Sequence, residues 1–313
     1  MKKIYVDKMD VTTTPFNIIS FITVSKYAFS HAFAGANAGA TADMLVYGLD
    51  SYKVMMQSQS GQFKMSRIFR GVFASAFLGS APSLFVFFGL YTPTKALLES
   101  LLRDKASSIT KEKSISILPP IIASIIAGVP ASLVAVPSDV VKKEMMLGSG
   151  NHISSAIDTY KHVFKIHGLR GLFIGWEVNL MKDIPFAGIK MTLYDLFCNI
   201  YIKYVTNHED KNNHILTPIE NAVIGFTSGS ITGIVTCPMD VVNTRIKSGE
   251  FPPDNGIIKT HIDILNLKQH NNGGIQALFR GAIPRVITIG IGSTAFWWSY
   301  AMYNQFMMNM LKI

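Results

Sequence analysis

Three short segments decide the fold: Gly-Leu-Asp-Ser-Tyr-Lys at 48–53, Pro-Ser-Asp-Val-Val-Lys at 137–142 and Pro-Met-Asp-Val-Val-Asn at 238–243. Their acids, Asp50, Asp139 and Asp240, are spaced by 89 and 101 residues. A second series of the form Phe-x-Gly follows at 69–71, 173–175 and 279–281, with spacings of 104 and 106 residues. Two different motifs that recur in the same order at one common period predict three tandem copies of one structural unit.

Long apolar runs separate these motifs. Four contain no Asp, Glu, Lys or Arg (71–94, 114–138, 221–239 and 286–311), and two more polar segments lie at 29–49 and 175–201. A helix needs roughly 20 residues to cross a bilayer. Because a mean hydropathy of +0.28 with 16% charged residues is too apolar for a water-exposed surface, we expect an all-α membrane protein. The pattern predicts six transmembrane helices in three pseudo-symmetric repeats around a central cavity.

Each predicted unit is a long helix that ends near the Pro/Asp motif, a polar stretch, the Phe-x-Gly landmark and a return helix. The predicted boundaries are an N-terminal extension at 1–27 and repeats at 28–105, 116–206 and 218–313. Pro137 and Pro238 are expected to kink the first helix of their units, since proline removes a backbone donor. Small residues recur on these first helices and predict close helix packing: Gly35 and Gly39, Ala127 and Ala131, then Gly225, Gly229 and Gly233.

Charge and residue usage exclude several classes of protein. The net charge of +9 suits loops that meet anionic lipid headgroups. Nucleic-acid binding is excluded because Lys and Arg are dispersed, with no interleaved aromatic platform. An enzyme is not expected, since the sequence shows no nucleophile–base arrangement, metal cluster or phosphate loop. Cys198 and Cys237 lack metal spacing and are expected to be packing thiols. Asp7 and Asp10 argue against a cleavable presequence.

The repeated motifs resemble those of the mitochondrial carrier family (solute carrier family 25), in which PxDxxK precedes an aromatic-basic-Gly motif. The resemblance covers residues from about 28 to 312. Within the family the chain is most similar to the S-adenosylmethionine carriers, on the strings DSYKVMMQSQ (50–59), GSAP (79–82), VPSDVVK (136–142) and KDIPFAGI (182–189).

The resemblance implies transport of S-adenosylmethionine by alternating access across the mitochondrial inner membrane, with S-adenosylhomocysteine as an exchange partner. Related carriers also serve plastids. Other interpretations stay open: a carrier for iron, a carrier for a basic or neutral amino acid, and a membrane scaffold or channel that does not transport. The resemblance further implies a monomer that contacts membrane lipids, including bound cardiolipin. No cofactor and no metal are expected.

The resemblance also implies a matrix gate made by acids and bases of neighbouring motifs: Asp50, Lys53, Gln57, Asp139, Lys142, Asp240 and Asn243. Asp50 would pair with Lys142, and Asp240 with Lys53. The remaining acid would face Asn243, so this gate is incomplete. Gln57, one turn after Lys53, would brace one bridge.

The opposite, cytoplasmic gate of the family follows an aromatic-acid-x-x-base pattern, which is eroded in this chain. Thr92 and Ala301 replace the acids and Cys198 replaces a base. Lys95 and Asp195 remain as gate remnants, and the pattern assigns no partner to either. A weak gate leads to the hypothesis that transport is not tightly obligatory exchange.

The resemblance places the substrate-binding residues at six positions midway along the helices: Gly79, Ser80, Lys182, Asp183, Ile289 and Gly290. Lys182 and Asp183 are the most informative, because an adjacent cation and anion suit a substrate that bears both a carboxylate and an ammonium group. A binding site for a purely anionic substrate would be expected to contain cations without Asp183. A binding site for a divalent metal would be expected to contain carboxylates, His or Met without Lys182. The methionyl end of S-adenosylmethionine fits this charge pattern.

Overall fold

The computed structural model describes residues 18–57, 72, 74–105, 118–147, 156–173, 176–204, 216–247, 256–266, 274–279 and 282–311. Every element in this part of the chain is helical, as the sequence predicts: α2 (Ile18–Gln57), the π-helix η2 (Ala74–Ser80), α3 (Ala81–Lys105), α4 (Leu118–Leu147), α5 (Ala156–Leu172), α6 (Trp176–Tyr204), α7 (Pro218–Val235), α8 (Cys237–Lys247), α9 (Gly256–Asn266), α10 (Gly274–Leu278) and α11 (Ala282–Leu311).

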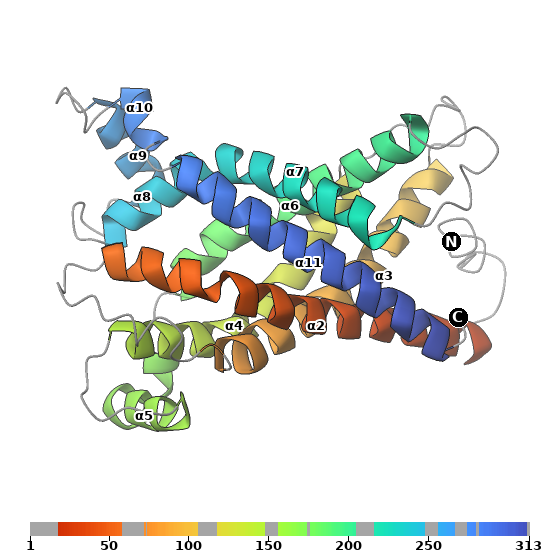
Figure 1. The fold of residues 1–313 in the computed structure, drawn as a ribbon, viewed down its shortest axis with the longest axis horizontal. Helices are drawn as coiled ribbons and strands as arrows, with labels where there is room; N and C mark the ends of the chain where they lie inside the picture. Colours follow the sequence, from red (N-terminus) through yellow and green to blue (C-terminus); the bar gives the residue numbers. More distant parts are fainter. Residues whose placement is uncertain are drawn as a thin grey trace.

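The long helices run across the molecule and form a bundle (Figure 1). The short helices α5, α9 and α10 lie at the same end of the bundle, with α5 on the side away from α9 and α10, and we call this end the short-helix end. The first residues of α2 and the last residues of α11 mark the opposite end, which we call the termini end. α3, α6 and α11 therefore run from the short-helix end towards the termini end, and α2, α4 and α7 run in the other direction.

Two of the Phe-x-Gly landmarks form turns with the same hydrogen bonds. Phe173 joins α5 to α6, and Phe279 joins α10 to α11. In each turn the Phe N–H donates to the carbonyl three residues earlier, at 3.2 Å for Phe173 and 3.3 Å for Phe279. The Phe carbonyl in turn accepts from the residue three positions later, at 3.3 Å and 3.0 Å respectively. The landmark at 69–71 lies outside the described residues.

A glycine stands five residues before each of these turns. Gly168 has a φ of 63° and Gly274 a φ of 79°, in the left-handed region that glycine adopts at little cost. Both glycines therefore redirect the chain just ahead of the return helix. The matched glycine was not part of the sequence pattern, yet it recurs with the same spacing as the phenylalanines.

The small residues of α7 allow α11 to approach closely, as the sequence predicts. Gly225 faces Trp297, and a Cβ added to it would lie 2.9 Å from the carbonyl oxygen of Ser293. A Cβ on Gly229 would lie 3.1 Å from the carbonyl oxygen of Ile289. These distances are too short for an unstrained contact, so the contact between α7 and α11 requires glycine at these two positions.

The other two predicted small faces are also packed. Gly35 and Gly39 on α2 face Phe88 and Leu84 of α3, respectively. Ala127 and Ala131 on α4 are buried in the central apolar cluster. The prediction that the small residues of these three helices permit close packing is confirmed.

The two prolines predicted to kink helices have different effects. α7 ends at Val235 and α8 begins at Cys237, so the helix is interrupted immediately before Pro238. The Thr236 hydroxyl donates to the carbonyl of Thr232 at 2.7 Å, beside this interruption. At Pro137 the helix is not interrupted, because α4 continues to Leu147.

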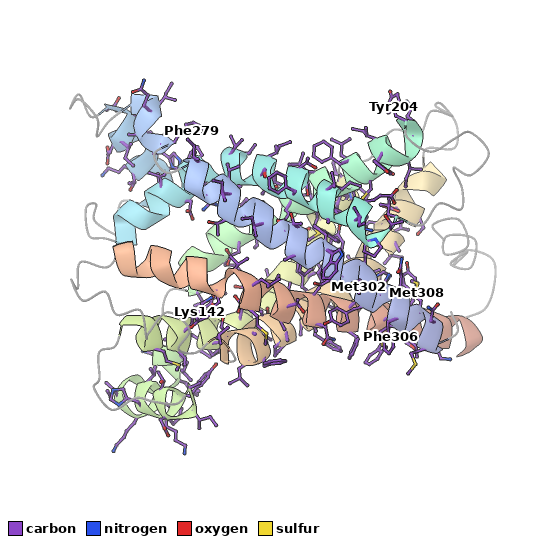
Figure 2. The ribbon with its side chains drawn as sticks, viewed as in Figure 1. Lys142, Tyr204, Phe279, Met302, Phe306 and Met308 are labelled. Atoms are coloured by element: carbon purple, nitrogen blue, oxygen red, sulfur yellow. The ribbon has the colours of Figure 1, made fainter. Side chains whose placement is uncertain are left out.

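Two described helical segments are long and apolar enough, by length and composition, to cross a membrane: Ser75–Leu101 and Leu118–Lys142. α7 and α11 are not among these segments, and Gly, Ser and Thr occupy many positions along both helices. These helices nevertheless present large apolar side chains outward. Ile219 is 72% exposed, and Met302 and Phe306 lie exposed along α11 (Figure 2).

Candidate functional site

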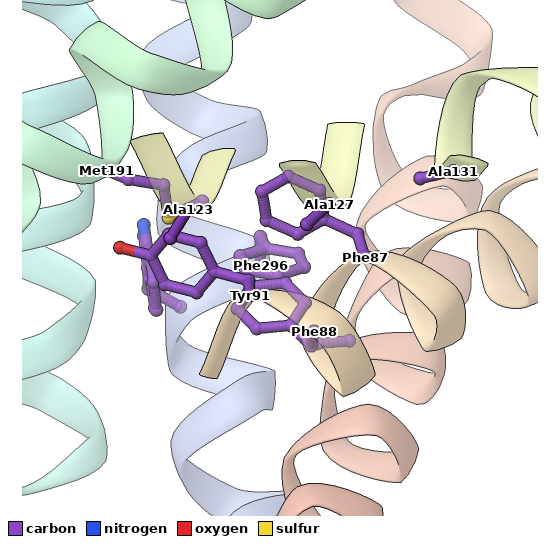
Figure 3. Packing of buried hydrophobic residues seen from close by; sticks show 10 residues of the cluster. Phe87, Phe88, Tyr91, Ala123, Ala127, Ala131, Met191 and Phe296 are labelled. Carbon is purple, nitrogen blue, oxygen red and sulfur yellow. The ribbon is translucent and has the colours of Figure 1, made fainter. Parts of the chain in front are cut away.

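An aromatic layer joins the three return helices. It consists of rings from α3, α6 and α11: Phe87, Phe88, Tyr91, Tyr194, Phe296, Trp297 and Tyr300. The rings of Phe88 and Phe296 stack at 5.6 Å between centroids, and those of Tyr194 and Trp297 at 3.4 Å with an interplanar angle of 5°. Figure 3 shows the part of this layer that surrounds Phe296. The layer holds α3, α6 and α11 in mutual contact at this level.

An ion pair adjoins this layer on its termini side. Lys95 lies one turn after Tyr91 and pairs with Asp195, which follows Tyr194. The side chains are 15% and 23% exposed. This corrects the sequence interpretation that assigned Lys95 and Asp195 no partner. Each is the surviving half of an incomplete motif on a different helix, and such a pair is recognisable only when the arrangement of the helices is known.

Hydroxyl groups of the layer also contact the first helices of the units. The Tyr300 hydroxyl lies 2.5 Å from Nδ1 of His31 on α2. The Tyr194 hydroxyl donates to the side-chain oxygen of Asn221 on α7. The layer is therefore linked by hydrogen bonds to two further helices as well as closed by ring packing.

A second ion pair lies towards the short-helix end of the bundle. There Lys142 of α4, labelled in Figure 2, pairs with Asp43 of α2 at 3.4 Å. Asp43 also accepts a hydrogen bond from the Ser75 hydroxyl at 2.5 Å, and the Lys142 ammonium lies 4.7 Å from the ring centroid of Tyr47. The predicted partner, Asp50, has a side chain outside the described residues. Asp43 lies two turns earlier on α2, a position that the motif spacing did not single out.

Asp240 forms an ion pair with Arg285 of α11. Arg285 also donates to the Gly233 carbonyl at 3.3 Å and to the Thr236 hydroxyl at 3.0 Å. It therefore holds α11 to the junction of α7 and α8. The predicted pairing of Asp240 with Lys53 lies outside the described residues. Arg285 was missed because the motif considers only bases within the PxDxxK segments.

The remaining matrix-gate residues are described only in part. Asp139 lies on α4 with a partly buried side chain. The preceding Ser138 donates to the carbonyl of Leu78 at 2.7 Å and contacts the Tyr160 hydroxyl at 2.5 Å. This motif therefore connects α4 to η2 and α5. The side chains of Gln57 and Asn243 lie outside the described residues.

The predicted substrate residues occupy different surroundings. Gly79 is buried against Ser138, and Ser80 accepts a hydrogen bond from the Ser83 hydroxyl at 3.2 Å. Asp183 is partly buried on α6. The side chain of Lys182 lies outside the described residues.

The predicted substrate residues of α11 lie at the contact with α7. Ile289 packs against Gly229 and Gly233. Gly290 is buried, and a Cβ added to it would lie 2.7 Å from the Ser230 hydroxyl and 2.9 Å from the ring of Phe226. Two surface hollows, with volumes of about 530 and 360 Å³, lie over α7 and α11 and include neither residue.

Lys190 is a charged residue of α6 to which the sequence pattern gave no role. It lies one turn before Tyr194, at the edge of the aromatic layer. Its ammonium nitrogen lies 5.5 Å from the ring centroid of Phe296 and 6.0 Å from that of Phe186. The signal in the sequence is a lysine within an otherwise apolar stretch, Ile-Pro-Phe-Ala-Gly-Ile-Lys-Met at 184–191.

Long helices with outward apolar side chains, packed through small residues and containing ion pairs between them, define a helical membrane protein of the transporter class. The chain belongs to the mitochondrial carrier family, whose model matches residues 113–205 and 215–311. The members of this family are transporters of small molecules, so this protein is a transporter and not an enzyme.

Three curated relatives indicate where the chain lies within the family. It is 31% identical to S-adenosylmethionine carrier 1, chloroplastic/mitochondrial, of Arabidopsis thaliana, over 86% of this chain and 76% of the relative. It is 30% identical to the S-adenosylmethionine mitochondrial carrier protein homolog of Drosophila melanogaster, over 88% of this chain and 93% of the relative. It is 27% identical to the mitochondrial S-adenosylmethionine carrier protein of Mus musculus, over 85% of this chain and 90% of the relative.

Proposed function

We propose that this protein transports S-adenosylmethionine across the mitochondrial inner membrane by alternating access, with S-adenosylhomocysteine as a counter-substrate. Six helices span the membrane in this proposal: α2, α3, α4, α6, α7 with α8, and α11. They form three repeats, at 28–105, 116–206 and 218–313, around a central path. The similarity to S-adenosylmethionine carriers supports the substrate, and these relatives include both mitochondrial and chloroplastic carriers.

One observation carries the transport mechanism: ion pairs lie at two separate levels of the bundle. Lys95 and Asp195 pair beside the aromatic layer, and Lys142 pairs with Asp43 towards the short-helix end. The partly buried Asp183 lies about three turns before Asp195 along α6, and we place the substrate site between the two ion pairs. Two closable levels with a charged site between them are the arrangement that alternating access requires.

The closed aromatic layer supports an assignment of the conformation. We propose that the termini end faces the intermembrane space and that the layer, with Lys95 and Asp195, is the cytoplasmic gate in its closed form. The short-helix end then faces the matrix. Substrate would enter the central path from that side until it reaches the layer.

The proposed substrate site comprises the six positions predicted from the sequence, with Lys182 and Asp183 as its charged members. A carboxylate gains charge-assisted hydrogen bonds from a lysine, and an ammonium or sulfonium group is attracted to an aspartate. Gly79, Ser80, Ile289 and Gly290 would shape the surrounding wall. Membrane lipids, including cardiolipin, are the further partners proposed for a monomeric carrier.

The deciding experiment is uptake of labelled S-adenosylmethionine by the purified full chain in liposomes. Lys182→Ala and Asp183→Ala are each expected to lower uptake by about tenfold or more, since hydrogen bonds to charged groups contribute about 1.5–3 kcal/mol. Lys161→Ala and Asp158→Ala, at exposed positions of α5, are the matched controls and should transport normally.

The outcomes separate the alternatives. If both site variants transport normally, the site assignment is wrong. Uptake of iron or of a basic or neutral amino acid, without uptake of S-adenosylmethionine, would replace the proposed substrate. A protein that reconstitutes in the correct fold but takes up none of these solutes would fit a scaffold or channel.

A further inference from the structure

Lys190 differs from the other charged groups inside the described bundle. Lys95, Lys142 and Arg285 each pair with a carboxylate. Lys190 has no ion pair or hydrogen bond with any residue that the structure describes. Its ammonium instead lies over the rings of Phe296 and Phe186, and Phe296 is itself buried.

This arrangement leaves the charge of Lys190 incompletely compensated. A cation held within a membrane-spanning helix bundle loses most of its hydration. The face of a benzene ring attracts a cation, but more weakly than an anion does. A ligand that brings a carboxylate to Lys190 would therefore gain an interaction that no described residue of the chain provides.

Asp183 lies on the same face of α6 as Lys190. The two residues are seven positions apart, which is about two turns and about 10 Å along the helix axis. Asp183 lies towards the short-helix end, and Lys190 lies against the aromatic layer. A molecule between them meets a negative group at one end and a positive group at the other.

We propose that Lys190 binds the carboxylate of the transported substrate, while Asp183 attracts the substrate's positive group. The substrate class is a zwitterion, such as the amino-acid end of S-adenosylmethionine, and the inference rests on the proposed transport function. Lys190 is then a second cationic residue of the proposed site, besides Lys182, and it lies closer to the aromatic layer. Because Phe296 belongs to the aromatic layer, a carboxylate that draws the ammonium away from that ring removes one contact of the closed layer.

The test compares two ligands on the same protein sample: S-adenosylmethionine and its decarboxylated form. Binding is measured as the Kd from thermal stabilisation of the purified full chain, for wild type, Lys190→Gln and Lys190→Arg. Wild type should prefer the carboxylated ligand by about tenfold or more. Lys190→Gln should lose most of this preference and keep only the part that Lys182 contributes, while its affinity for the decarboxylated ligand is unchanged. Lys190→Arg, which keeps the charge, should retain the preference.

Lys203→Gln is the matched control, because Lys203 lies exposed near the end of the same helix with its ammonium 5.3 Å from the ring centroid of Tyr204. It should bind both ligands like wild type. An unchanged preference in Lys190→Gln overturns the proposal. A partial loss of folded protein does not obscure the result, since the preference is a ratio measured within one sample.

A wild-type protein that binds neither ligand contradicts the proposed function, and the role of Lys190 is then decided with methionine and methioninamide. Stronger stabilisation by methionine that is clearly reduced in Lys190→Gln supports a carboxylate site. An absence of any preference for the carboxylate in wild type overturns it.

Discussion

Lys95 and Asp195 show how single residues retain a function after a repeated motif has decayed. Each return helix would carry an acid and a base in an intact aromatic-acid-x-x-base motif. α3 retains only the base and α6 only the acid, and these two survivors form an ion pair. The pair forms between two helices rather than within one motif, so the periodicity of the sequence does not reveal it.

Breaking this pair should weaken the closed layer. Lys95→Ala and Asp195→Ala are each expected to lower the stability of the folded protein by about 1–3 kcal/mol, because the removed group leaves a partly buried charge behind. Melting temperature in detergent measures this loss. The exchanged double variant, Lys95→Asp with Asp195→Lys, is the control and should recover most of the stability. If both single variants melt like wild type, the pair does not hold the layer closed.

Asp43 shows a different limit of sequence reasoning. The motif spacing indicates that Lys142 meets an acid of α2 and selects Asp50. The structure shows Lys142 paired with Asp43, which also accepts a hydrogen bond from Ser75, while the side chain of Asp50 lies outside the described residues. The two acids are seven residues apart and share one helix face, so the period of the helix alone cannot distinguish them.

At the scale of the helices, the small-residue seams were predictable and the interruptions were not. Glycine at four-residue spacing indicates a face that a neighbouring helix approaches, and the contact of α7 with α11 follows that rule. Proline at 137 and at 238 occupies the same place in the motif. Of the two, only Pro238 follows an interruption of the helix, beside which Arg285 donates to the Thr236 hydroxyl.

The contact of α7 with α11 should not tolerate a methyl group. Gly229→Ala is expected to destabilise the protein by about 1–3 kcal/mol, because the added Cβ would lie closer than van der Waals contact to the Ile289 carbonyl oxygen and to Ser293. Gly128→Ala is the matched control on α4, where the nearest atom to the added Cβ is 3.8 Å away. Thermal unfolding compares the two. Equal melting temperatures would show that the α7–α11 contact can relax.

At the scale of the whole molecule, the helical architecture and the family were predictable because both depend on periodic patterns. Long apolar runs, small-residue faces and the tandem motifs are all properties of spacing. The interior partners of Lys142, Asp240 and Lys95 depend on which helices face one another. That information is present only in the packed bundle, so the network inside it was predicted incompletely.

The closed layer also bears on whether transport requires exchange. Among the described residues, one ion pair and the packed rings connect α3, α6 and α11 beside the layer. Such a gate should reopen without a bound counter-substrate. We expect measurable uptake of labelled S-adenosylmethionine into liposomes that contain none. The rate should lie within about tenfold of the exchange rate, which corresponds to a difference of at most about 1.4 kcal/mol in activation free energy. Uptake that depends strictly on internal substrate would contradict this expectation.

The stack of Tyr194 on Trp297 gives the protein a built-in optical probe. Trp297 is buried and belongs to α11, whereas the tyrosine ring against it belongs to α6. Any rearrangement that separates these two helices also separates the rings and admits water to the indole, which shifts tryptophan emission to longer wavelength. With Trp176 and Trp298 replaced by phenylalanine, emission from the one remaining indole would follow the opening of the layer in real time, without an attached dye.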